Sequence, residues 1–233
     1  MNEPNSVADT AANPASQDKL VPRNLPDLRQ KKVPSQQRAV ETFERILAAC
    51  GDLLGEVGIE RLSTNLVCQR AGISPPALYQ YFPNKYAILC ELAERLMRSQ
   101  NALLTPWATA QTWRLPEPEL AASIADLFIR TLQLTEQMPA GIWITRALRA
   151  VPTLQEVRHS SHELVTDLLV HPFMQAYPQA DQAEVRLTLR LGIDALYAAQ
   201  ELLFDNPRLD PRAVARTMAA MVTGQLVKLR QSE

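Results

Sequence analysis

Apolar residues recur along this chain with the three- and four-residue period of amphipathic α-helices. One apolar face ends just before Gly58 and consists of Phe43, Ile46, Leu47, Cys50, Leu53, Leu54 and Val57. Most later prolines fall between periodic segments, and no run has the length and turn chemistry of a β-hairpin. The pattern therefore predicts an all-α protein.

Three helix starts follow one another closely after this first helix. Ser63 is a suitable N-cap for a short helix that stops at Gly72, and Ser74 opens a second short helix. Asn84 caps a long third helix, which Pro106 ends. Two short capped helices joined by a glycine-containing turn match the helix-turn-helix arrangement of DNA-binding proteins.

The second short helix divides into anchoring and outward positions. Leu78 and Phe82 are four residues apart and are expected to hold it against the first helix. Pro75 and Pro76 suit the first turn, where their missing N–H groups have no intrahelical partner to lose. The positions expected to face DNA on this helix are Pro75, Pro76, Ala77, Tyr79 and Gln80.

Lys85 follows the cap residue Asn84 directly. A cation is disfavoured at a helix N-terminus unless an anion is shared there, and a phosphate binds such a site well. We therefore expect Lys85 to contact a DNA phosphate.

The segment "LSTNLVCQRAGISPPALYQYFPNKYAIL" resembles the N-terminal domain of the TetR family of bacterial transcriptional regulators. The resemblance implies a helix-turn-helix domain over residues 36–98 and a helical ligand-binding and dimerisation domain over 99–233. It also implies a DNA-binding surface that adds Ser63, Thr64, Asn65, Ser74, Tyr81 and Lys85 to the outward positions of the second short helix. The sequence departs from the family pattern at Pro76, Cys68 and Tyr86, where glycine, alanine and an acid are usual.

Residues 1–35 are expected to form a disordered basic arm. They contain few large apolar side chains, so they bury too little surface to offset the entropy of ordering. The formal net charge of the chain is −1, yet the stretch from Lys19 to Arg38 holds six basic residues and the single acid Asp27. This distribution favours an anionic partner more than the sum suggests.

The second half of the chain carries weaker signals. Its last helix, opened by Asp210 and Pro211, has small residues at 215, 219, 220 and 224, which favour close packing of helices and a four-helix interface between two copies. A homodimer also suits DNA geometry, because two recognition helices related by a twofold axis read an inverted repeat. Ordinary core packing competes with an apolar ligand pocket for Phe128, Trp143, Phe173 and Tyr197, while His162 is a candidate hydrogen-bonding group for a ligand.

No catalytic or metal constellation is visible in the sequence. His159 and His162 lie three apart, but His171 is expected beyond the end of their helix, and two ligands do not make a metal site. The chain shows no nucleophile–base pair, paired carboxylates or phosphate loop, so no enzyme and no cofactor is expected. Cys50, Cys68 and Cys90 fit buried thiols better than disulfides or a redox switch.

We therefore predict a cytoplasmic, ligand-responsive repressor that binds a palindromic DNA operator as a homodimer and is released by a small, largely apolar molecule. The sequence predicts no membrane span and no secretory signal. Two alternatives stay open: a DNA-bound interaction protein that has no small-molecule inducer, and a transcriptional activator.

Overall fold

The computed structural model describes residues 26–31 and 37–230, and every regular element within them is a helix. The all-α prediction is confirmed. The helices are α1 (Gln37–Arg61), α2 (Thr64–Ala71), α3 (Pro75–Tyr79), α4 (Lys85–Leu104), α5 (Ala110–Trp113), α6 (Glu117–Gln137), α7 (Gly141–Ala150), the short 3₁₀ turn η1 (Pro152–Leu154), α8 (Gln155–Ala176), α9 (Gln182–Asp205) and α10 (Pro211–Arg230).

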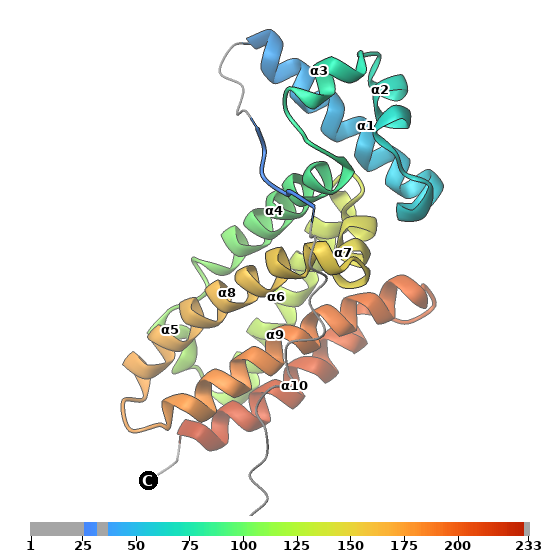
Figure 1. Cartoon of the computed structure of the whole chain (residues 1–233). Coiled ribbons are helices and arrows are strands. Elements are labelled where there is room, and N and C mark those ends of the chain that lie inside the picture. The colour runs from blue at the N-terminus through green and yellow to red at the C-terminus, as the bar shows by residue number, and fades with distance from the viewer. Residues whose placement is uncertain (1–25, 32–36, 231–233) are drawn as a thin grey trace, which may run out of the picture.

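The helices form two groups that α4 joins. Figure 1 shows α1, α2 and α3 together at one end of the molecule, and α5, α6, α8, α9 and α10 as a bundle at the other end. Helix α4 begins beside the first group and runs into the second. Helix α4 therefore packs against helices of both groups.

Two hydrophobic clusters fill these groups, and the first extends beyond the predicted helix-turn-helix domain. Its buried members come from α1 to α4 and also include Ile144 and Leu148 on α7 and Leu154 on η1. The predicted boundary after residue 98 falls inside α4. Apolar packing thus continues from the first group of helices into the second.

Two glycines adopt the left-handed conformation that other residues rarely tolerate. Gly58 has φ 72° and interrupts α1 near its end, which is where the sequence pattern placed the end of this helix. Gly72 has φ 62° and ends α2 as its C-cap, with its N–H donating to the carbonyls of Cys68 and Gln69. Both stops create the short segments that a helix-turn-helix requires.

Helix α8 is longer than the sequence indicated. It continues through Pro172 to Ala176. His171 therefore lies inside the helix, and the expectation that it lies beyond the helix end is wrong. Pro172 and its neighbour Phe173 are buried, and their packing offsets the hydrogen bond that proline cannot donate.

Residues 26–31 lie against the first group of helices. Leu28 is half-buried and packs on the first hydrophobic cluster. The sequence predicted a disordered arm through residue 35, and for these six residues the structure shows contacts with the folded domain instead. The rest of that prediction concerns residues outside the described part of the chain. None of the described helices is both long and apolar enough to cross a membrane.

Candidate nucleic-acid interface and internal cavity

Helix α2 is fixed at both ends by the residues that the sequence pointed to. The Ser63 Oγ accepts a hydrogen bond from the Leu66 N–H at 3.3 Å, so Ser63 is the N-cap. After Gly72, the Ile73 N–H donates to the Cys68 carbonyl at 3.1 Å and closes the turn toward α3. Cys68 is buried where α2 meets its neighbours, which explains why a small side chain stands there.

Helix α3 buries one side and exposes the other. Leu78 and Phe82 are fully buried, and the Phe82 ring stacks on Phe43 of α1 with 4.9 Å between centroids. Pro75 and Pro76 occupy the first turn, as predicted, although Ser74 makes no side-chain capping bond. The exposed residues around this turn are Asn65, Ser74, Pro75, Pro76, Tyr79 and Gln80, while Ser63, Thr64 and Ala77 are half-buried beside them.

Tyr79 connects the outward face of α3 to α2. Tyr79 is 41% exposed. Its hydroxyl lies 3.0 Å from the Thr64 Oγ1, and either oxygen can be the donor. A phenol tied down in this way loses little entropy when it binds a further acceptor.

Lys85 makes contacts that the sequence did not predict. Its Nζ donates to the backbone carbonyls of Ile59 at 3.0 Å and Leu62 at 2.9 Å, at the end of α1. The break at Gly58 leaves carbonyls there without helical partners, and the ammonium group satisfies two of them. Asn84 caps α4 as predicted, since its Oδ1 accepts from the Ala87 N–H at 3.0 Å.

Tyr81 does not belong to the exposed surface. It is buried, and its ring meets Phe43 edge to face at a centroid distance of 5.8 Å. The resemblance had implied a DNA backbone contact for this residue. In the free protein Tyr81 is instead part of the core that holds α3 in place.

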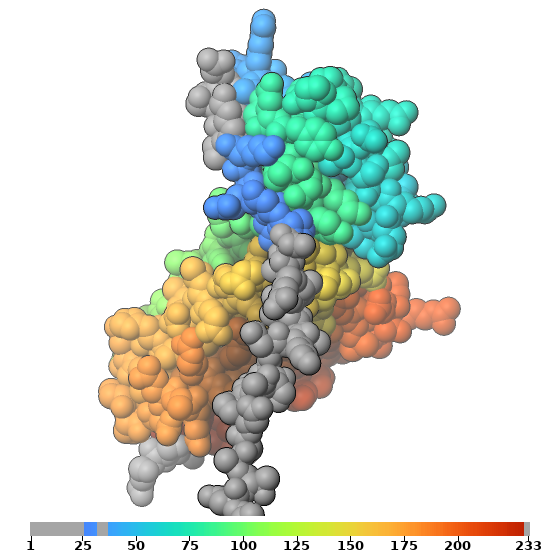
Figure 2. Space-filling view, viewed as in Figure 1, coloured from blue at the N-terminus to red at the C-terminus, as the bar shows by residue number. Residues whose placement is uncertain are grey.

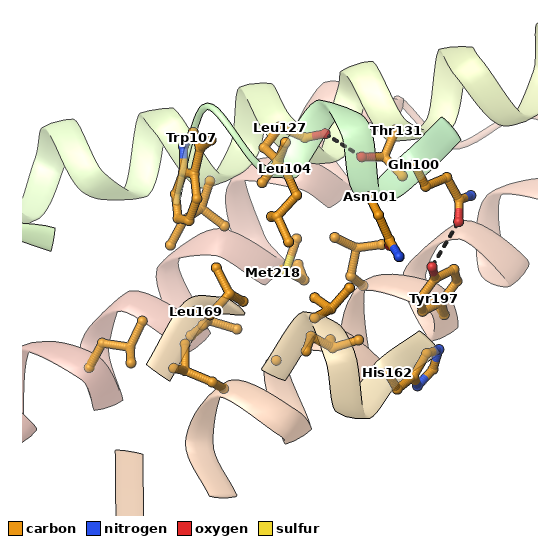
Figure 3. A pocket seen from close by; sticks show the side chains of 18 of the residues that line it. Gln100, Asn101, Leu104, Trp107, Leu127, Thr131, His162, Leu169, Tyr197 and Met218 are labelled. Carbon is orange, nitrogen blue, oxygen red and sulfur yellow. Dashed lines mark hydrogen bonds between the residues drawn. The ribbon is translucent and has the colours of Figure 1, made fainter. Parts of the chain in front are cut away.

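A cavity of about 100 Å³ lies between α4, α6, α8, α9 and α10. Its walls are mostly apolar, and Leu104, Trp107, Leu127, Leu169 and Met218 are among the side chains that Figure 3 shows around it. Polar side chains gather at one end, where Gln100, Asn101, His162 and Tyr197 lie.

A hydrogen-bond chain crosses the polar end of the cavity. The Tyr197 hydroxyl donates to the Gln100 Oε1 at 2.8 Å, and the Gln100 Nε2 donates to the Thr135 Oγ1 at 2.8 Å (Figure 3 shows the first bond). The His162 ring stacks on Tyr197 at 4.8 Å, and its Nδ1 lies 3.0 Å from the Asp194 Oδ1. The chain joins α9 to α4 and α6.

The cavity carries no formal charge near neutral pH. Burial lowers the pKa of His162 to about 4, even though Asp194 acts in the opposite direction. Among the described residues, those that line the cavity include no Asp, Glu, Lys or Arg. A charged ligand would therefore lose its hydration without gaining a counter-ion.

The structure places only two of the five predicted ligand residues at this cavity, His162 and Tyr197. Phe128 and Phe173 are fully buried in the second hydrophobic cluster and do not line the cavity. Trp143 is 41% exposed and packs its indole near Gly55 and Arg146, away from the cavity. Ordinary packing therefore explains these three aromatic residues better than ligand binding.

Gln100 and Asn101 were missed. Two amides interrupt the apolar pattern near the end of a long helix, and Gln100 is almost fully buried. An amide at a helix position where the periodic pattern predicts a buried apolar residue is the signal that could have identified this cavity.

The described residues contain no candidate metal site and no disulfide. No group of three or more His, Cys, Asp or Glu side chains there is placed to hold a metal ion. Cys50, Cys68 and Cys90 are buried free thiols, and burial raises the pKa of Cys50 and of Cys90 to about 12. Burial therefore favours the neutral thiol form of both residues at neutral pH over the nucleophilic thiolate.

Helices α9 and α10 expose an apolar groove. Leu191 and Leu202 on α9 and Met221 on α10 line it, and Met221 is 73% exposed. The small residues Ala215 and Ala219, which were expected at an interface between copies, are instead buried within the chain. The exposed side of the same two helices remains available for a second copy.

The sequence similarity to known proteins is strongest in the helix-turn-helix domain. Residues 46–92 match the family described as "Bacterial regulatory proteins, tetR family". The tetracycline repressor protein class A from transposon 1721 of Escherichia coli is 39% identical over 69 residues, which is 30% of this chain and 32% of that protein. An uncharacterized HTH-type transcriptional regulator of Mycobacterium bovis is 37% identical over 70 residues, or 30% of this chain and 36% of its own. The chain thus matches about a third of the length of these relatives.

Solved structures extend the likeness of the fold to most of the chain. The structure described as a SmeT-triclosan complex has a TM-score of 0.61 and 20% identity, and the match covers 78% of this chain and 90% of that one. FadR, a fatty acid degradation regulator from Bacillus halodurans, has a TM-score of 0.57 and 15% identity, with 82% and 96% covered. The predicted resemblance to the TetR family is confirmed for the helix-turn-helix segment, and the solved structures show that the rest of the chain has the same helical fold.

Proposed function

We propose, because residues 46–92 match the tetR family of bacterial regulatory proteins, that this protein is a repressor that binds a palindromic DNA site as a homodimer. A small, neutral, largely apolar molecule enters the cavity and releases it from DNA. One observation carries the DNA-binding part. Helix α3 is anchored by fully buried Leu78 and Phe82, so its proline tip, Tyr79 and Gln80 are held outward.

The exposed residues divide between backbone and base contacts. Hydroxyl and amide groups on Asn65, Ser74 and Tyr79 suit phosphate oxygens, which position the protein on the duplex. Pro76 and Ala77 offer apolar contact to a thymine methyl, and Gln80 offers an amide to a base edge. Because α3 has only five residues, each copy reads a few base pairs.

A dimer follows from the apolar groove between α9 and α10. Leu191, Leu202 and Met221 are all more than 45% exposed, and a side-by-side pairing of these two helices from each copy buries them in a four-helix interface. The twofold axis of such a pair makes the DNA site an inverted repeat.

Helix α4 is the element through which a ligand acts. Gln100 near its end borders the cavity, and Lys85 at its start holds the end of α1. A molecule that displaces Gln100 moves α4, the helix that supports the DNA-binding helices α1, α2 and α3. It then favours a spacing of the two α3 helices that does not fit successive major grooves. A structure of the same fold is described as a complex with triclosan, which supports a neutral ligand of low polarity.

A mobility-shift titration with the DNA that flanks the protein's own gene tests this function. We expect a complex whose stability depends on sequence and salt, and which a neutral apolar molecule dissociates. Absence of any sequence-selective complex would contradict the DNA-binding role. A complex that resists every neutral molecule that binds the protein would contradict only the release mechanism.

A further inference from the structure

The recognition surface has almost no free positive charge. From Ser63 to Asn84 the sequence holds a single basic residue, Arg70. The Arg70 guanidinium is engaged by Glu56, to whose two carboxylate oxygens it donates at 2.8 and 2.6 Å. Lys85, which follows this segment, points its ammonium group at backbone carbonyls. Duplex binding depends on the neutralisation of phosphates by Lys and Arg, so further cations must come from elsewhere in the chain.

Residues 26–31 are fixed to the folded domain at several points, one of which is a hydrogen bond from the Gln30 Nε2 to the Glu91 carboxylate on α4. The Lys31 N–H donates to the Tyr81 carbonyl at 2.9 Å, just after the end of α3. The Asn84 Nδ2 donates to the Asp27 carbonyl at 2.9 Å, while the other end of the same amide caps α4. Leu28 packs on the hydrophobic cluster between these points. Figure 1 shows this segment in dark blue, running from beside α4 toward the end of the molecule that holds α3.

Two cations on this segment project into solvent. The Arg29 side chain is 91% exposed, and its contact with the half-exposed Asp27 at 3.4 Å is a surface ion pair of little strength. Lys31, the last residue of the described segment, is also exposed. In Figure 2 the segment lies on the surface of the first group of helices.

We propose that residues 26–31 are a second DNA-contacting element, in which Arg29 and Lys31 bind phosphate oxygens of the duplex beside the bases that α3 reads. This inference rests on the proposed DNA-binding function. The hydrogen bonds from Lys31 to Tyr81 and from Asn84 to Asp27 set the register of the segment against α3. The segment supplies sequence-independent affinity, and α3 supplies sequence preference.

The test uses the full-length protein and a duplex selected by the wild-type protein from a random library. The variant is Arg29→Gln combined with Lys31→Gln. Its matched control is Arg114→Gln combined with Arg130→Gln, which removes the same charge from exposed positions on the α5 side and on α6. All four side chains are exposed, so the free energy of unfolding should stay unchanged in both proteins. Dissociation constants are measured at a series of salt concentrations.

We expect the affinity of the variant with Arg29→Gln and Lys31→Gln, here called the arm variant, to depend less on salt concentration than that of the wild-type protein. Each phosphate contact contributes about −0.9 to the slope of log K against log salt, so loss of two contacts per protomer makes the slope shallower by about 3 to 4 for a dimer. Binding should weaken by the same factor on preferred and mismatched duplexes. The control should keep the wild-type slope.

Equal slopes for the arm variant and the control would overturn the inference while leaving the proposed function intact. A change in base preference would also overturn it, because it would place the segment on base edges. If the wild-type protein selected no sequence at all, the proposed function would fail, and this inference with it.

Discussion

The Tyr79 hydroxyl lies 3.0 Å from the Thr64 hydroxyl, so the exposed face of α3 is tied to the start of α2. The two residues are fifteen positions apart and belong to the two halves of the helix-turn-helix. Because each hydroxyl both donates and accepts, the pair keeps further hydrogen-bonding capacity for a phosphate oxygen. The proposed backbone contact is thus held in position before DNA arrives.

Tyr79→Phe should weaken DNA binding by about 3- to 10-fold on every duplex, because one hydrogen bond to phosphate is lost and no base contact is touched. Dissociation constants on preferred and mismatched duplexes give the measurement. Thr64→Val is the matched control, since it removes the partner but keeps the phenol, and should cost less affinity. Wild-type affinity of Tyr79→Phe would show that its hydroxyl serves only the contact with Thr64.

Gln80→Ala should relax preference at one position of each half-site. A side-chain amide that reads a base edge discriminates against the wrong base by about 1 to 3 kcal/mol. Library selection with the variant reveals the position. Asn65→Ala loses an exposed amide of the same kind on α2, yet should weaken all sequences alike. If Gln80→Ala selected the wild-type motif with unchanged stringency, Gln80 would not read a base.

Lys85→Met should lower the free energy of unfolding by about 1 to 3 kcal/mol, because two carbonyls at the end of α1 lose a charged donor. Urea unfolding followed by circular dichroism measures this change. Lys31→Met, whose side chain is exposed, should leave the stability unchanged. A shallower salt dependence of DNA binding with wild-type stability would restore the simpler role of Lys85 as a phosphate ligand.

His162 should make stability depend on pH between about 4 and 6.5. Its pKa falls from 6.5 to about 4 on burial, so within this range the unfolded chain binds more protons than the folded one. The contribution of His162 is complete above pH 6.5 and is lost as the pH falls, by up to roughly 3 kcal/mol.

Urea midpoints from pH 4.5 to 7.5 measure this dependence. His162→Gln should lose part of the wild-type slope, whereas His159→Gln, at an exposed position of the same helix, should keep it. Identical slopes for the two variants would show that His162 is not held neutral by the fold.

Met221→Glu should produce a monomer, because a carboxylate would be buried in the proposed α9–α10 interface. Light scattering coupled to gel filtration measures the mass. Leu164→Glu places the same charge at an exposed leucine of α8 outside this groove and should leave the dimer intact. A dimer that survives Met221→Glu would place the interface elsewhere.

The helix boundaries of the helix-turn-helix domain were predictable because the residues that set them act locally. Ser63, Gly72 and Asn84 fix helix ends through bonds to residues three or four positions away. The partners of Lys85 were not predictable. They exist only because Gly58 breaks α1 and the end of α1 then meets the start of α4.

The cavity was predicted poorly for the same reason. Phe128 and Phe173 have the size and polarity of pocket residues, but the packing of α6 and α8 buries them completely. Gln100 became a cavity residue because three distant helices supply Thr135, Tyr197 and His162 around it. Sequence periodicity gives the buried face of each helix and says nothing about which helices leave a gap.

Selection of DNA from a random duplex library by the purified protein tests the central claim most directly. The account predicts an inverted repeat, with half-sites of a few base pairs separated by about one helical turn, and relaxed preference at one position of each half-site when Gln80 is replaced. Enrichment of no motif, at salt concentrations where nonspecific binding is suppressed, would contradict it.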